Sequence, residues 1–446
     1  MTAFGEALPS VTVPPPGPRS RELARRLEAV ESRNVTYLGE DFPVFWEEAR
    51  GANVRDADGN VYIDLTGAFG VALLGHAAPV VAEAVAAQGG RLVHGMGDVH
   101  PPEVKVRFLE ALCGALGEWA EEPRAVLATS GSEAVEIALK TAALSSGRFG
   151  VLAFEGGYHG LTLGALSVTA RPYFREPFQD RVPGGVTWLP FPSRNAEVAS
   201  VLEAVERILE RQATAVDPEA GVGAILLEPV QARGGVRIPG RGFGAGLTAL
   251  ARRFGVLLIA DEIYTGLGRC GGVLASPRVG LEPDIVCLGK VLGGGLPLSA
   301  CVARRRVMDA WPASPGEALH TSTFLGHPLA CAAGIAVLQE VEAGLADRAE
   351  TVGRRLLRSL REGLAGSAGV RDVRGLGLLI GIEVAPGRGP RVAADALRRG
   401  LMVLPAGDRG EVVELSPPTV LTEGQEAWAV RELIEILKVE DGEEVG

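Results

Sequence analysis

Two residues combine a chemically active side chain with an apolar sequence environment. Lys290 follows the apolar run DIVCLG and precedes the glycine loop VLGGGLP, so its amine has no obvious solvated face. Burial favours the unprotonated amine, which is a nucleophile. Asp261 lies late in the run VLLIADEI, where a carboxylate is costly unless it is paired or hydrogen-bonded. Each also has a structural interpretation: Lys290 as a lysine that reaches solvent from a strand end, and Asp261 as a cap on the next loop.

A candidate anion site lies at the start of the segment TSGSEAVEIAL. Ser130 and Glu133 have capping-box spacing, which predicts that a helix begins here. Gly131 permits close approach to the backbone, and the first N–H groups of the helix, with the hydroxyls of Ser130 and Ser132, suit an anion. An ordinary capped helix would have the same pattern.

Tyr158 and His159 form an aromatic pair on the loop that follows the run VLAF. An aromatic side chain at a strand end can stack on a flat ligand, or it can pack beneath its own loop. The six histidines show no HxH or HExxH spacing and the five cysteines form no CxxC pair, so we expect no metal site.

A GxGxxG pattern is formed by Gly266, Gly268 and Gly271 after a predicted strand. In a dinucleotide-binding protein this pattern opens a helix at once. Here Pro277 and a loop-like stretch follow instead. A nicotinamide oxidoreductase is therefore the weaker alternative.

The elements that must position these side chains can be read from five short apolar runs. Continuous apolar runs without alternation are typical of strands buried on both faces, and here they alternate with helical patterns. We therefore predict an α/β fold whose large domain has a mostly parallel sheet covered by helices on both sides. The runs span residues 125–129, 151–154, 224–230, 256–263 and 284–290.

The same patterns predict four segments along the chain. Residues 1–19 are proline-rich and read as an N-terminal arm. Residues 20–70 and residues 334–446 together are expected to build a smaller α+β domain. Residues 71–333 are expected to form the large domain.

The composition excludes several classes of protein. The chain has 446 residues, with 44 Lys plus Arg against 55 Asp plus Glu, so its net charge is −11. This balance argues against a nucleic-acid-binding protein or a basic membrane-surface protein. An odd number of cysteines and an N-terminus without a signal-peptide pattern favour a cytoplasmic location.

Six stretches, in this order, resemble the class III (subgroup II, ω-type) pyridoxal-phosphate-dependent aminotransferases of fold type I. The resemblance runs from about Val35 to Leu437. It implies a pyridoxal 5′-phosphate (PLP) cofactor, an amine donor, a 2-oxo acid acceptor and a ping-pong reaction. The stretches are SGSEAVEIALK, GYHGLTLGAL, EPVQARGG, DEIYTGLGRCGG, GKVLGGGLPLSA and HTSTFLGHPLACAA.

The resemblance also implies roles for individual residues. Lys290 would form the Schiff base with the cofactor and later carry a proton, and Asp261 would pair with the pyridinium nitrogen. Gly131 and Ser132 would hold the phosphate from one subunit. Thr323 would reach the same phosphate from the second subunit of a homodimer.

The remaining cofactor contacts implied by the resemblance surround the ring. Tyr158, next to His159, would stack on one face, and Ile263 would pack on the opposite face. Gln231 matches the glutamine near the ring hydroxyl.

One departure from the family pattern is an exchange of charges. Family members that act on ω-amino acids often read EPVQGEGG, and their glutamate pairs with a C-terminal arginine that binds the acceptor carboxylate. Here the corresponding residues are Arg233, in EPVQARGG, and Glu414, in VVELSPP. Our hypothesis is that they still pair, with Arg233 now available to a substrate carboxylate. Glu414 would then suit a second ammonium group of a diamine or diamino acid. The alternatives are a purely structural pair, or a slipped match at Glu414.

A second departure lies on the other side of the expected pocket. Leu161 stands where 4-aminobutyrate and ornithine aminotransferases often have arginine, and Phe69 stands near a commonly aliphatic position. Both make that side more apolar, which disfavours 4-aminobutyrate and acetylornithine as substrates.

Other activities share the central residues. A PLP-dependent racemase or epimerase and a decarboxylating transaminase would use the same lysine and aspartate. A non-catalytic scaffold of this fold is disfavoured, because it would not need both Lys290 and Asp261.

Overall fold

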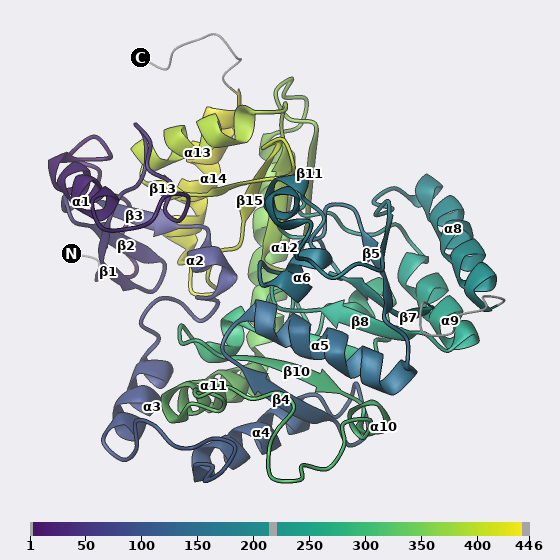
Figure 1. The fold of residues 1–446 in the computed structure, drawn as a ribbon. Helices are drawn as coiled ribbons and strands as arrows, with labels where there is room; N and C mark the ends of the chain where they lie inside the picture. Colours follow the sequence, from purple (N-terminus) through teal and green to yellow (C-terminus); the bar gives the residue numbers. More distant parts are fainter. Residues whose placement is uncertain (1–2, 214–220, 439–446) are drawn as a thin grey trace. The chain divides into compact units, whose positions relative to one another are not determined.

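The computed structural model describes residues 3–213 and 221–438. It forms two compact units. The large unit comprises residues 79–350, and the small unit combines residues 1–78 with residues 351–446. Figure 1 shows the elements of each unit along the chain.

The large unit is built on one seven-stranded sheet with the order β4-β10-β9-β8-β7-β5-β6. Neighbouring strands from β9 to β6 are parallel, and β10 is antiparallel to both β9 and β4. The prediction of an α/β fold with a mostly parallel sheet is confirmed. The strands are β4 (Arg124–Ala128), β5 (Gly150–Phe154), β6 (Val186–Leu189), β7 (Val222–Leu227), β8 (Leu257–Asp261), β9 (Ile285–Leu288) and β10 (Ser299–Ala303).

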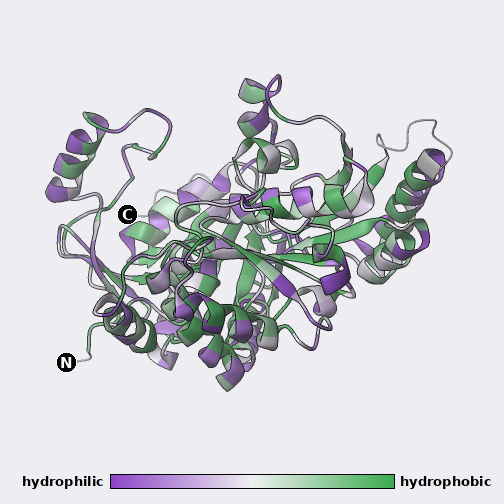
Figure 2. Ribbon diagram, turned by 60° about the horizontal axis from the view of Figure 1, so that its bottom comes forward, coloured by the Kyte–Doolittle hydropathy of each residue, from purple (hydrophilic) through white to green (hydrophobic). Residues whose placement is uncertain are grey.

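Helices cover both faces of this sheet, which explains why its strands read as unbroken apolar runs. On one face Leu226 and Ile259 pack with Ile137 of α5. On the other face Ile225 and Leu258 belong to one buried cluster with side chains of α8 and α9. Figure 2 shows the strands coloured mainly as hydrophobic, whereas the helices mix both classes. Burying each such side chain stabilises the fold by about 1.5–3 kcal/mol.

Two helices of the large unit, α3 and α4, precede its first strand, and the others follow. The α-helices are α3 (Pro79–Gly89), α4 (Glu103–Ala115), α5 (Gly131–Ser146), α6 (Leu163–Ser167), α7 (Pro172–Arg175), α8 (Asn195–Ala213), α9 (Phe243–Phe254), α10 (Arg305–Met308) and α11 (Pro328–Glu340). Short 3-10 turns are η1 (Glu176–Phe178), η2 (Ser276–Val279) and η3 (Lys290–Gly293), and the π-helical turn η4 (Val341–Leu345) leads into α12 (Ala346–Gly363).

The small unit contains two four-stranded sheets, with the orders β1-β2-β3-β13 and β11-β12-β15-β14. Its strands are β1 (Trp46–Arg50), β2 (Asn53–Asp56), β3 (Val61–Asp64), β11 (Asp372–Leu376), β12 (Leu379–Glu383), β13 (Leu401–Met402), β14 (Leu404–Ala406) and β15 (Val412–Leu415). Its helices are α1 (Pro18–Glu28), α2 (Gly67–Gly70), α13 (Arg388–Arg398) and α14 (Glu423–Lys438).

One helical run in the described ranges, Pro328–Gly363, is long and apolar enough by composition to cross a membrane. Half of its apolar stretch is buried. Its first part, α11, packs against α3 and α4 of the large unit. We therefore assign it to the protein core.

The glycine pattern after β8 does not open a helix. Residues Glu262 to Ala275, all of them described, form consecutive turns and end in the 3-10 turn η2. Gly268 has a φ of +101° and Gly271 a φ of +74°, so both glycines serve these turns. A dinucleotide-binding loop needs a helix at this point, so the nicotinamide alternative is wrong.

Candidate active site

A cavity of about 600 Å³ lies at the carboxyl ends of β5, β7 and β8, beside the first turn of α5. This edge of a parallel sheet is where such folds bind ligands. The predicted site residues that line it are Gly131, Ser132, Tyr158, His159, Leu161, Arg233, Asp261, Ile263 and Lys290. The other lining residues are Ser130, Gly160, Thr162, Glu228 and Tyr264.

The last residue of β8, Asp261, is held in a fixed orientation. Its side chain is buried, and its Oδ2 lies 2.8 Å from Nδ1 of His159. Its Oδ1 accepts a hydrogen bond of 3.1 Å from the N–H of Ile263. The backbone N–H of His159 donates in turn to the hydroxyl of Thr169 at 3.0 Å. An oriented, buried carboxylate of this kind favours a positive charge or a bound proton on a ligand atom in front of it.

The start of α5 forms the anion-binding side of the cavity. The N-cap Ser130 accepts from the N–H of Glu133 at 3.2 Å, so this half of the predicted capping box is present. The carboxylate of Glu133 accepts from the N–H of Thr129, at 2.8 Å, rather than from that of Ser130. A Cβ at Gly131 would lie 2.9 Å from Cδ1 of Ile263, so any larger residue there requires the Ile263 side chain to shift.

The hydroxyl of Ser132 joins this helix start to the loop after β5. Its Oγ accepts from the N–H of Leu161 at 2.9 Å. The hydroxyl hydrogen is then directed to another acceptor, such as an anion in the cavity. A Cβ at Gly160, whose φ is +117°, would lie 1.9 Å from this Oγ, so the loop approaches α5 only with glycine there.

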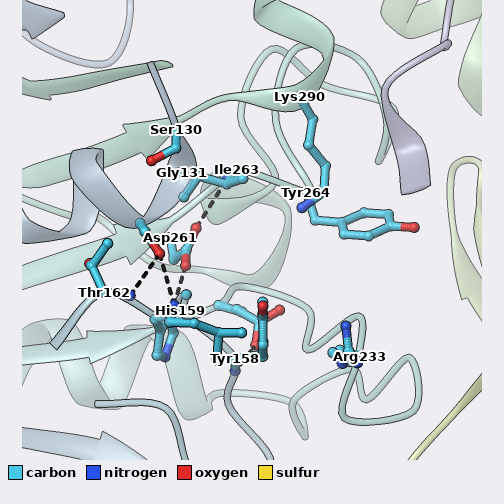
Figure 3. Close-up of a pocket in the computed structure, with 14 residues that line it drawn as sticks. Ser130, Gly131, Tyr158, His159, Thr162, Arg233, Asp261, Ile263, Tyr264 and Lys290 are labelled. Atoms are coloured by element: carbon cyan, nitrogen blue, oxygen red, sulfur yellow. Dashed lines mark hydrogen bonds and ion pairs between the residues drawn. The ribbon is translucent and has the colours of Figure 1, made fainter. Parts of the chain in front are cut away.

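Lys290 begins the turn η3 directly after β9, and its φ of +47° is unusual for a residue other than glycine. Its side chain extends into the pocket, as Figure 3 shows. The amine Nζ lies 4.2 Å from the ring centroid of Tyr264, which the sequence analysis did not single out. A cation over an aromatic face is stabilised by the ring. The ring of Tyr264 lies directly beside this amine.

Arg233 lies over two aromatic rings at the side of the cavity. Its guanidinium carbon is 4.9 Å from the ring centroid of Tyr158 and 5.4 Å from that of Phe174. Burial raises the pKa of the Tyr158 phenol, and the positive charge of Arg233 acts in the opposite sense. Among the described residues of the large unit, no carboxylate forms an ion pair with Arg233. Its guanidinium therefore lines the cavity without a salt bridge to a carboxylate of the described large unit.

Glu228, directly after β7, is a lining residue that the sequence analysis missed. Its carboxylate is buried and accepts from two backbone N–H groups, that of Tyr158 at 3.0 Å and that of Ala232 at 3.1 Å. Burial, reinforced by the negative charge of Asp261 and opposed by His159, raises the pKa of Glu228 to about 7. Within the sequence, only its place in the stretch EPVQARGG marks it.

Two residues expected at the cofactor do not line this cavity. Gln231 is buried behind it, and its Nε2 donates to the carbonyl of Glu155 at 2.9 Å. Thr323 is exposed and lies on the segment between α10 and α11. Its expected role concerns a second subunit.

The other two predicted substrate residues belong to the small unit. Phe69 lies in α2 with a φ of +59° and is 62% exposed. It lines an apolar cavity of about 390 Å³ together with residues such as Trp46 and Met402. Glu414 lies on β15, opposite Gly381 of β12, and is buried. Its pairing with Arg233 stays a prediction.

A comparison with known families identifies the family of this chain. The model of the class-III aminotransferases matches residues 36–437. The chain belongs to the class-III aminotransferases.

Individual relatives agree with this assignment. Acetylornithine aminotransferase from Methanopyrus kandleri is 40% identical over 398 residues, which cover 89% of this chain and 95% of the relative. 5-Aminovalerate aminotransferase from Pseudomonas aeruginosa is 34% identical over 419 residues, which cover 91% and 95%. An amine transaminase structure from an uncultivated Pseudomonas species, in a PLP-bound form, matches with a TM-score of 0.82 at 31% identity. It covers 91% of this chain and 97% of that one.

The predicted family, fold type, enzyme class and PLP cofactor are therefore confirmed at the level of the family. The racemase, epimerase and decarboxylating alternatives find no support among these relatives.

Proposed function

We propose that this aminotransferase moves an amino group from an amine, an ω-amino acid or a diamino compound to a 2-oxo acid, with PLP held in the cavity of the large unit. The observation that carries the proposal is the arrangement of three groups around one cavity. These are the amine of Lys290, the buried Asp261–His159 pair and the capped start of α5. When bound, PLP supplies an aldehyde that condenses with amines and a ring that accepts electrons.

Residues that line the cavity fit the phosphate, the ring nitrogen and the ring faces of this cofactor. The N–H groups at the start of α5 and the hydroxyl of Ser132 suit its phosphate. Asp261, oriented by His159, would hold the proton on the ring nitrogen. Tyr158 and Ile263 line the cavity and would pack on the two faces of the ring.

Lys290 would do the covalent and the proton-transfer work. Its amine is the nucleophile that would hold PLP in the cavity. The released Nζ would then take the proton from the substrate carbon that bears the amino group. The ring of Tyr264, 4.2 Å away, would stabilise the resulting ammonium.

Arg233 is the group that we assign to the carboxylate of the 2-oxo acid. It lines the cavity, and Tyr158 and Phe174 support its guanidinium. A guanidinium binds a carboxylate through two parallel hydrogen bonds. We expect Arg233→Ala to raise the KM for the 2-oxo acid about tenfold or more, with Arg233→Lys in between. An unchanged KM in Arg233→Ala would exclude this role.

The amino donor would enter beside an apolar wall. Leu161 lines the cavity and is half exposed, and Phe69 is proposed to contribute from the small unit. The relatives named for acetylornithine and 5-aminovalerate suggest a primary amine at the end of a chain. Leu161 disfavours a donor whose carboxylate needs a cationic side chain of the protein at this position. A panel of monoamines, diamines and ω-amino acids, scored by amino-acid product, tests the class.

We propose that the active form is a homodimer in which Thr323 reaches the phosphate of the partner's cofactor. Two neighbouring segments of the large unit carry exposed apolar side chains, and the hydroxyl of Thr321 donates to Asp98 between them at 2.7 Å. A surface of this kind marks a protein interface. The exposed side chains are Leu92, Val93, Met96, Val99, Leu319 and Phe324.

A cytoplasmic location completes the proposal. All five cysteines are unpaired, and four of them are buried. Unpaired cysteines are typical of a reducing compartment.

A further inference from the structure

Two loops that face the cavity are joined by the buried side chains of Glu228 and Gln231. The first loop follows β5 and carries Tyr158, and the second follows β7 and carries Arg233. Glu228 lies between them: its Oε1 accepts from the N–H of Tyr158, and its Oε2 accepts from the N–H of Ala232, which directly precedes Arg233.

The side chains carried by these two loops also touch each other. The guanidinium of Arg233 lies 4.9 Å from the centroid of the Tyr158 ring. One carboxylate thus fixes the backbone at, or next to, both members of this cation–π pair. We propose that Glu228 is a positioning residue for the acceptor substrate, because it holds Arg233 and Tyr158 in the arrangement that receives the carboxylate of the 2-oxo acid.

This task needs a carboxylate of this length. Each oxygen of Glu228 accepts one N–H, so an amide in its place would turn an NH₂ group toward one of the two donors and lose that hydrogen bond. An aspartate would be too short to reach both loops. The side chain is 5% exposed, so water cannot replace a lost partner without opening the site.

The groups around Glu228 agree with a role in positioning rather than in proton transfer. Both of its oxygens are occupied by backbone donors. Asp261, the nearby acid, is itself oriented by His159 and Ile263. Glu228 therefore acts on the substrate through Arg233. The inference rests on the proposed role of Arg233 in binding the acceptor.

The test compares Glu228→Gln, Arg233→Ala and the double variant in the PLP-loaded enzyme. We expect Glu228→Gln to raise the KM for the 2-oxo acid about three- to tenfold, as loss of one buried hydrogen bond predicts, with kcat changed by less than about twofold. The double variant should have the KM of Arg233→Ala alone, because both changes remove the same contact.

A second readout does not depend on activity. Amide hydrogen exchange, followed by mass spectrometry, should become faster in peptides that contain Tyr158 or Ala232 when Glu228 is changed to Gln. Glu262→Gln is the matched control, since Glu262 is also buried and accepts from the backbone N–H groups of Ala275 and Ser276. It should leave the KM for the 2-oxo acid and the exchange at Tyr158 unchanged.

The outcomes separate the two proposals. If Arg233→Ala raises the KM but Glu228→Gln changes neither the KM nor the exchange, Glu228 is not a positioning residue. If Arg233→Ala itself leaves the KM unchanged, the proposed role of Arg233 fails and this inference fails with it. Should Glu228→Gln not fold, Glu228→Asp must show the same rise in KM, and its failure to do so overturns the inference.

Discussion

Asp261 and Glu228 are two buried carboxylates at one cavity, and different groups stabilise each of them. Asp261 faces the ring nitrogen of His159 at 2.8 Å. Glu228 faces two backbone N–H groups and no side-chain donor in the described structure. Burial raises the pKa of Glu228 to about 7, and the charge of Asp261 adds to this rise.

This pKa predicts a pH dependence of stability. The folded protein binds the proton of Glu228 more tightly than the unfolded chain, whose pKa is near 4.5. The free energy of unfolding should therefore fall as the pH rises from about 4.5 to about 7, by on the order of 3 kcal/mol, and then level off. Glu228→Gln should lack this contribution. Urea unfolding of the PLP-free protein at about pH 5 and about pH 8 measures this change in the free energy of unfolding. An equal change in the native protein and in Glu228→Gln would contradict the assignment.

At the residue scale, the sequence identifies groups that stand out chemically in an apolar run. Lys290 and Asp261 are of this kind, and both line the cavity. Glu228 was missed because its partners are backbone N–H groups of loops, and one of them is 70 residues away. Tyr264 was missed because an aromatic residue after a strand has no special pattern. Its place under the lysine amine depends on how η3 follows β9.

At the scale of elements, the first turn of α5 packs closely against Ile263 at Gly131. Gly131→Ala would place a Cβ 2.9 Å from Cδ1 of Ile263, so this side chain, which lines the cavity, must shift. We expect about tenfold weaker binding of PLP, because such overpacking costs about 1–3 kcal/mol. Titration of the PLP-free protein with PLP measures this change.

The matched control for this prediction is Gly114→Ala near the end of α4. A Cβ there meets nothing within 4 Å. It should raise the free energy of unfolding by up to about 1 kcal/mol, through helix propensity, and leave PLP binding unchanged. Equal PLP affinity in Gly131→Ala and the native protein would show that the close approach to Ile263 does not shape the site.

The sequence predicts elements well where one periodicity is unbroken. The five apolar runs correspond to β4, β5, β7, β8 and β9. β6 (Val186–Leu189) was not predicted, since it is short, lies at the sheet edge and has a mixed burial pattern. β10 (Ser299–Ala303) was not predicted either. It runs antiparallel between β4 and β9.

At the scale of the whole molecule, the proposed dimer requires an interface, and we expect the two exposed apolar segments of the large unit to form it. Phe324 is 55% exposed and its ring centroid lies 5.4 Å from that of His94. Phe324→Asp should convert the dimer to monomers and weaken PLP binding, because a buried charge at an interface costs several kcal/mol. Light scattering during size-exclusion chromatography reports the mass.

The control is Phe149→Asp in the turn between α5 and β5. Phe149 is 66% exposed and lies outside the two apolar segments. It should leave the mass unchanged. If the native protein is already a monomer, or if both variants behave alike, these segments are not the interface.

The central claim is that Lys290 anchors the cofactor covalently. The chain contains only four lysines, Lys105, Lys140, Lys290 and Lys438, so a label can be assigned without ambiguity. The measurement is borohydride reduction of the PLP-loaded protein, followed by mass spectrometry of its peptides. We predict that the pyridoxyl mass is found on Lys290 in the native protein and on no lysine in Lys290→Ala. A label on another lysine, or none on Lys290 although PLP is bound, would contradict the account.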